Sequence, residues 1–154
     1  MIYKVLGEID VDKLTSELNG FIVPSKGQQM LQGIKGQEDD SYGIGSYTQY
    51  REAERDFIYP IVKDADYLYS LLQQYDMFRT RIMSMSNKHY SWHADGTPRI
   101  HIPLISDTET NFMVIEDTVI RMEPGLIYWV DTTRKHTYVN TDTAYRVHIV
   151  GCVN

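Results

Sequence analysis

The spacing of hydrophobic and polar residues changes at about residue 78. Before this point, two segments, residues 10–20 and 64–78, carry apolar residues at helical spacing. The first has aspartates in its opening turn and ends on the stop signal Asn19-Gly20. The apolar face of the second consists of Leu68, Leu71, Leu72 and Tyr75. We therefore predict two helices in the N-terminal half of the chain.

From residue 78 onward the period is two, which is typical of β-strands. Turn residues, including Asp95-Gly96-Thr97-Pro98 and Glu123-Pro124-Gly125, separate seven short runs. The runs are residues 78–86, 99–106, 111–117, 118–123, 126–131, 136–140 and 144–153. This pattern predicts a mainly β sandwich or barrel with flanking helices. We expect one domain over residues 1–154, in which a helical N-terminal support (about 1–77) carries a β core (about 78–154).

The composition narrows the range of partners. The chain has 154 residues, 42% of them hydrophobic and 23% charged, which suits one globular domain. A net charge of −6 disfavours nucleic acid and anionic membranes as partners. A single cysteine allows no internal disulfide, and no apolar run has membrane-spanning length, so we expect a cytoplasmic protein. The glycine-rich residues 26–50 suit either a lid or a connecting loop.

All five histidines lie after residue 88, in the half predicted to be β. His93 and Asp95 form an H-x-D triplet, whose first and third side chains share one face of an extended strand. The triplet alone is a weak signal, because Asp-Gly also begins turns. His136, from a separate predicted strand, would complete the two-histidine, one-carboxylate set that suits non-haem Fe(II).

Two predicted strands also carry cations on one face and aliphatic residues on the other. Arg99 and His101 alternate with isoleucines in "RIHIPL", and Arg146 and His148 alternate with Val147 and Ile149 in "AYRVHIV". A surface position would explain one such arginine. Two strands with the same Arg-x-His pattern instead indicate two walls of a polar cavity.

Together these motifs resemble the iron(II)- and 2-oxoglutarate-dependent oxygenases. They are most similar to the aspartyl/asparaginyl β-hydroxylase and proline-hydroxylase-like branch. The resemblance covers about residues 81–150. It rests on H-x-D, R-x-H followed by Ile-Pro-Leu, Pro-Gly before an apolar strand, a distal histidine, and an arginine ten residues after it.

The resemblance implies a double-stranded β-helix, a cupin-like jelly roll, with Fe(II) and 2-oxoglutarate as cofactor and cosubstrate and dioxygen as oxidant. His93, Asp95 and His136 would bind the iron, and Arg146 would bind 2-oxoglutarate with help from His101. Arg99 would bind the substrate. Apart from the resemblance, we expect Asp131 either to accept a hydrogen bond from His136 or to be an ordinary aspartate at a strand end, and His148 to be either a core residue or a residue of the cavity.

The expected activity is hydroxylation of an unactivated C–H bond. Arg99 would be a surplus cation in the cavity, so the substrate should carry a carboxylate, as a free amino acid or a residue in a peptide does. The alternative is a non-catalytic or zinc-loaded cupin-like binding module for a small carboxylate or sugar. Nucleic-acid demethylation is disfavoured by the acidic charge, and a cupin isomerase by the missing H-x-H and Glu pattern. The oligomeric state stays open.

Overall fold

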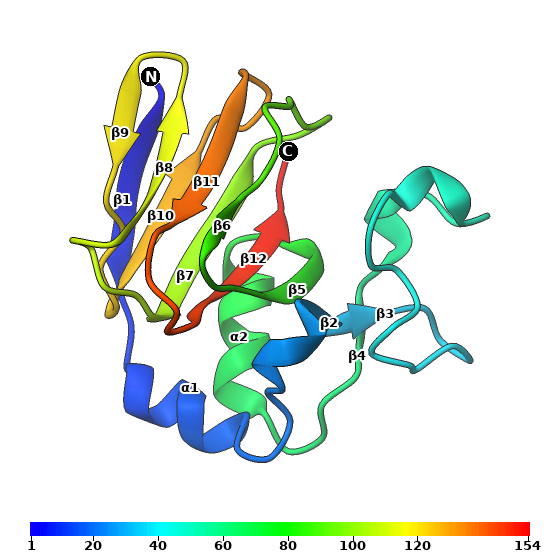
Figure 1. Cartoon of the computed structure of the whole chain (residues 1–154). Helices are drawn as coiled ribbons and strands as arrows, with labels where there is room; N and C mark the ends of the chain where they lie inside the picture. Colours follow the sequence, from blue (N-terminus) through cyan, green and yellow to red (C-terminus); the bar gives the residue numbers. More distant parts are fainter.

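The computed structural model describes all residues from 1 to 154, and its body is formed by two β-sheets (Figure 1). The larger sheet has six strands in the order β1-β10-β7-β12-β5-β2, and the smaller has four in the order β6-β11-β8-β9. The strands of the larger sheet are β1 (Tyr3–Glu8), β10 (Leu126–Val130), β7 (Arg99–Ile105), β12 (Arg146–Cys152), β5 (Phe78–Met85) and β2 (Gln28–Met30). Those of the smaller sheet are β6 (Lys88–His89), β11 (His136–Asn140), β8 (Asn111–Ile115) and β9 (Thr118–Ile120).

Successive strands of the C-terminal half pass between the two sheets. β7, β10 and β12 belong to the larger sheet, whereas β6, β8, β9 and β11 belong to the smaller, and all named pairs are antiparallel. This topology is a double-stranded β-helix, or jelly roll. The predicted fold class is therefore confirmed, and each of the seven predicted strands is present.

Two helices pack on the outer face of the larger sheet. They are α1 (Val11–Glu17) and α2 (Asp66–Gln74). Asp10 caps α1, since its Oδ1 accepts a hydrogen bond of 3.0 Å from the N–H of Lys13. Apolar residues of both helices join the outward-facing residues of β7 and β12 in one core of 16 buried residues. A second core, of eight residues, lies between the sheets. None of the helices is long and apolar enough to span a membrane.

The first 77 residues supply strands as well as helices. β1 and β2 form the two edges of the larger sheet, and β3 (Gln32–Gly33) pairs with β4 (Tyr59–Pro60). Three short 3-10 turns lie at Pro24–Lys26, Tyr47–Gln49 and Glu54–Asp56. The expected division into a helical half and a β half thus leaves out four short strands, β1 to β4, which lie before residue 77.

A bulge in β5 shapes the wall of the cavity described below. Between the pairs Val150–Arg81 and Cys152–Phe78, β5 contains one residue more than β12. Arg79 lies in this bulge with a positive φ of 47°. A bulge locally changes the direction of side chains along a strand.

Candidate functional site

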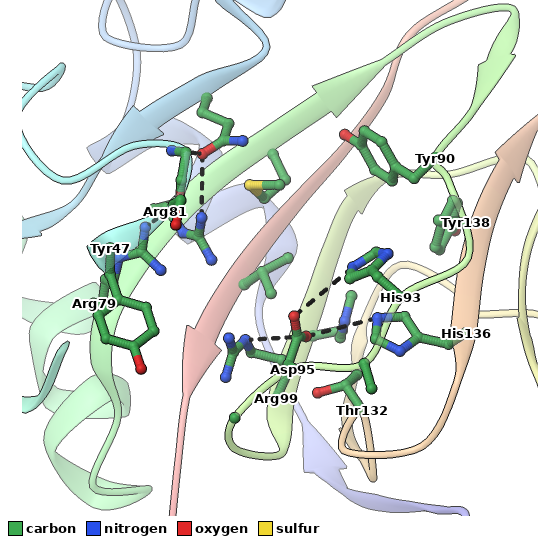
Figure 2. Close-up of a pocket in the computed structure, with 18 of the residues that line it drawn as sticks. Tyr47, Arg79, Arg81, Tyr90, His93, Asp95, Arg99, Thr132, His136 and Tyr138 are labelled. Carbon is green, nitrogen blue, oxygen red and sulfur yellow. Dashed lines mark hydrogen bonds and ion pairs between the residues drawn. The ribbon is translucent and has the colours of Figure 1, made fainter. Parts of the chain in front are cut away.

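A cavity of about 480 Å³ is lined by residues of β5, β7 and β12 from the larger sheet and of β8 and β11 from the smaller (Figure 2). This volume is typical of a site for a small molecule. Six of the eight predicted site residues line it, and His148 and Asp131 do not. The residues in its lining that can carry charge or coordinate a metal include Glu54, Arg79, Arg81, His93, Asp95, Arg99, His101, His136 and Arg146.

Backbone pairing brings the three predicted metal ligands together. The N–H of His93 donates to the carbonyl of His136 at 3.1 Å, and the N–H of His136 donates to the carbonyl of His93 at 2.8 Å. Asp95 is held by its N–H, which donates to the carbonyl of Thr132 at 2.8 Å. The potential ligand atoms of His93, Asp95 and His136 consequently lie within 4.8 Å of one another.

The orientation of both imidazoles suits a metal ion. Nδ1 of His93 lies 2.7 Å from the carbonyl oxygen of Ser91, and Nδ1 of His136 lies 2.8 Å from that of Arg134. These contacts favour a proton on each Nδ1 and leave each Nε2 as a lone-pair donor. The Nε2 atoms lie 3.7 and 3.6 Å from the Asp95 carboxylate, too far for hydrogen bonds. One ion with bonds of about 2.0–2.2 Å can reach two ligands across such separations.

The protonation state of His136 also suits metal binding. His136 is buried, and this burial lowers its pKa below the ordinary value of 6.5. Neutral imidazole is the form that binds metals, so the site is prepared for a cation at neutral pH. The side chain of His93 is 41% exposed, so this side of the cluster is accessible to solvent.

Arg146 is a buried cation whose charge has no counterpart in the chain. Its Nη1 donates to the carbonyl of Met83 at 3.0 Å, and its guanidinium lies 3.8 Å from the centre of the Tyr138 ring. Its Nε is buried without a hydrogen-bond partner, and no ion pair in the chain involves this residue. Burial lowers the pKa of Arg146, but arginine stays charged at neutral pH. An anionic ligand would supply the missing partner.

His101 and His148 form a buried pair beside this arginine. Their Nδ1 atoms are 3.2 Å apart, and Nε2 of His148 lies 3.4 Å from the Tyr138 hydroxyl. His101 faces the cavity, whereas His148 lies behind the lining. Burial, together with the charge of Arg146, lowers the pKa of both histidines well below 6.5.

Stability should therefore fall as the pH drops below about 6.5. The unfolded chain protonates His101 and His148 at about pH 6.5, whereas the folded protein keeps them neutral to lower pH, so protons favour unfolding. The free energy of unfolding should fall by up to about 1.4 kcal/mol per pH unit for each histidine. Denaturant unfolding between pH 8 and 5 measures it. His148→Gln should reduce the slope and His89→Gln, at an exposed position, should not. An equal slope in the wild type and His148→Gln would contradict the assignment.

The structure corrects the interpretation of Arg99 as a surplus cation. Arg99 has acidic partners on two sides, Oε2 of Glu54 at 3.8 Å and Oδ2 of Asp95 at 3.6 Å. Its Nη1 also donates to the carbonyl of Thr97 at 2.9 Å. The charge of Arg99 is thus compensated within the protein, and the main argument for its binding a substrate carboxylate is removed.

Asp131 does not orient His136, contrary to the prediction. Its carboxylate accepts a hydrogen bond of 3.0 Å from Nε of Arg134, and another from the hydroxyl of Thr133. The acceptor next to His136 is instead the carbonyl of Arg134. The turn before β11 places this carbonyl, rather than the aspartate, beside the imidazole.

Three charged residues of the cavity were missed at the sequence level. Arg79 and Arg81 alternate with Thr80 and Ile82 on β5, the same pattern that identified Arg99 and Arg146. The segment "FRTRIMSM" carries that signal. Glu54 had no comparable signal, because it comes from a short 3-10 turn outside any periodic segment.

Comparison of the sequence with protein-family models and with curated proteins gives no match. Solved structures do resemble the fold. A viral collagen prolyl hydroxylase from Paramecium bursaria Chlorella virus-1, in complex with 2OG, is 11% identical, with a TM-score of 0.55 over 100% of this chain and 97% of that one. AviO1 from Streptomyces viridochromogenes Tue57 is 11% identical, with a TM-score of 0.54 over 99% and 90%. The nickel complex of the non-heme monooxygenase ThoJ is 11% identical, with a TM-score of 0.50 over 97% and 71%. At this identity the likeness establishes the fold.

Proposed function

We propose that the protein is an Fe(II)- and 2-oxoglutarate-dependent dioxygenase that hydroxylates an unactivated C–H bond of a small, carboxylate-bearing substrate. One observation carries the proposal. A two-histidine, one-aspartate cluster and the unpaired cation of Arg146 line the same cavity. A metal-binding module needs the histidine and aspartate cluster but not the unpaired arginine, whereas an oxygenase of this class uses both.

One set of residues would bind the metal, and another would bind the cosubstrate. His93, Asp95 and His136 would hold the iron, which supplies dioxygen activation coupled to decarboxylation of 2-oxoglutarate. Overall, one oxygen atom of dioxygen enters the product hydroxyl group and the other enters succinate, with release of carbon dioxide. Arg146 would bind the distal carboxylate with its planar fork, supported by the ring of Tyr138. His101, Tyr138 and Arg146 are buried, so this wall would shield the distal end of the cosubstrate from bulk water.

The fold neighbours and the size of the cavity support this proposal. The viral prolyl hydroxylase of similar fold was solved with 2OG, and ThoJ is described as a non-heme monooxygenase. A cavity of about 480 Å³ leaves space for an amino-acid-sized substrate beside the cosubstrate. The substrate would be a free amino acid or an amino-acid residue in a peptide.

Succinate formation from 2-oxoglutarate tests the proposal. Protein loaded with Fe(II) in air should form succinate, and free amino acids and peptides should be screened for faster formation. Protein loaded with Zn(II) is the matched control and should bind 2-oxoglutarate without converting it. If Fe(II)-loaded protein bound metal but neither bound nor consumed 2-oxoglutarate, it would instead be a metal-containing binding module.

A further inference from the structure

Arg81 on β5 is a second cation of the cavity that has no acidic partner. It is only 7% exposed and lines the cavity. Its Nη1 donates to the neutral Oε1 of Gln28 at 3.1 Å, and its Nε is buried without a hydrogen-bond partner. No ion pair in the chain involves Arg81. A buried cation without an anionic partner is energetically unfavourable, and an anionic ligand would supply that partner.

The two arginines nearest to Arg81, in contrast, both have acidic partners. Arg79, two residues earlier on β5, has its Nη1 2.8 Å from Oε2 of Glu54, and its guanidinium also donates to the carbonyls of Gly43 and Gly45. Arg99 shares Glu54 and also pairs with Asp95. The acidic groups are therefore already engaged by other cations, and the free anion-binding capacity lies at Arg81.

Arg81 also lies at a different place from Arg146. In the β5–β12 register, Arg81 is opposite Val150, whereas Arg146 is opposite Met85. Four residues along a strand separate these positions, which is about 13 Å between their backbones. The charges that act on Arg81 include those of Arg79 and Arg99. Figure 2 shows Arg81 on the opposite side of the cavity from the histidine and aspartate cluster.

The charge of Arg81 persists at neutral pH. Burial, reinforced by the nearby charge of Arg79, lowers its pKa to about 10. The guanidinium is thus still protonated at pH 7, and burial makes its charged form less favourable in the cavity than in water.

We propose that Arg81 binds a carboxylate of the substrate and thereby holds the rest of that molecule in front of the His93, Asp95 and His136 cluster. Gln28 would help, because its Oε1 accepts from Arg81 and from the N–H of Gly45, which leaves Nε2 as a further donor for the carboxylate. The role of this carboxylate in a hydroxylation rests on the proposed function. The anion site itself rests on Arg81 alone.

Binding of matched carboxylates and carboxamides tests the proposal. The probes are the free L-amino acids, their N-acetyl derivatives and the corresponding carboxamides, titrated into protein that holds Fe(II) and 2-oxoglutarate without oxygen. At least one carboxylate should bind, and its carboxamide should bind about a hundredfold more weakly. Arg81→Met should weaken binding of the carboxylate by a similar factor, leave that of the carboxamide unchanged, and leave 2-oxoglutarate affinity within about twofold. The control Arg51→Met, at an exposed position outside the cavity, should bind as the wild type does.

Melting temperatures show whether the variants fold. Without ligand, Arg81→Met should melt at or above the wild-type temperature, because it removes an unpaired buried charge. Arg79→Met should melt lower, because it separates Glu54 from its nearest partner.

Three results would overturn the proposal: no carboxylate bound by the wild type, equal carboxylate affinity in Arg81→Met, or a hundredfold loss of 2-oxoglutarate affinity in that variant. The last would assign Arg81 to the cosubstrate instead. If the wild type bound no 2-oxoglutarate at all, the proposed function would fail. The same probes and variants, applied to metal-free protein, would then test the anion site separately.

Discussion

Replacing both His93 and His136 by alanine is expected to remove tight binding of Fe(II) and all iron-dependent succinate formation. The double variant loses both Nε2 donors that face Asp95, and the remaining carboxylate already lies 3.6 Å from Arg99. Loss of a group that merely orients a metal ligand weakens metal binding by about 10- to 100-fold. Loss of two ligands should therefore exceed about a hundredfold. Metal content after gel filtration and calorimetric titration with Fe(II) measure the effect.

His89→Ala is the matched control for this experiment. His89 is exposed on β6 and its Nδ1 contacts only the carbonyl of Tyr90, at 3.1 Å. Its variant should bind iron as the wild type does. Iron binding of wild-type strength in the double variant would show that the metal site lies elsewhere in the chain.

Arg146→Ala is expected to raise the 2-oxoglutarate requirement by about a hundred- to several-thousandfold. Breaking one side of a buried charge pair costs about 3–5 kcal/mol, which corresponds to that range of affinity. Iron binding should change little, because Arg146 makes no hydrogen bond to His93, Asp95 or His136. Titration of 2-oxoglutarate into Fe(II)-loaded protein measures the shift.

Arg146→Lys separates charge from geometry. Lysine keeps the positive charge but lacks the planar fork, so this variant should fall between the wild type and Arg146→Ala. An unchanged requirement in Arg146→Ala would contradict the assignment, and would make Arg81 the next candidate for the distal carboxylate.

The sequence by itself determined the strands of the β core and six of the residues that line its cavity. Period-two alternation is a local consequence of burying one face of a strand, so β5, β7 and β12 could be predicted without knowledge of their neighbours. The same alternation placed His101 and Arg146 on the inner face. The cluster of His93, Asp95 and His136 could be predicted from residue types and spacing, and the structure places its three ligand groups within 4.8 Å of one another.

Only the tertiary structure decided which charges compensate one another. Arg81 and Arg99 are both inward-facing arginines on period-two strands, but only Arg99 has an aspartate four residues before it, Asp95, with which it pairs. Neither strand pattern reveals the second partner, Glu54, which lies 45 residues before Arg99 and reaches both Arg79 and Arg99 from a short turn, while Arg81 has no acidic partner. Likewise, the loop geometry before β11 gave His136 the carbonyl of Arg134 instead of Asp131. Ion pairs depend on distances between segments remote in sequence, and the alternation of one strand carries no information about those distances.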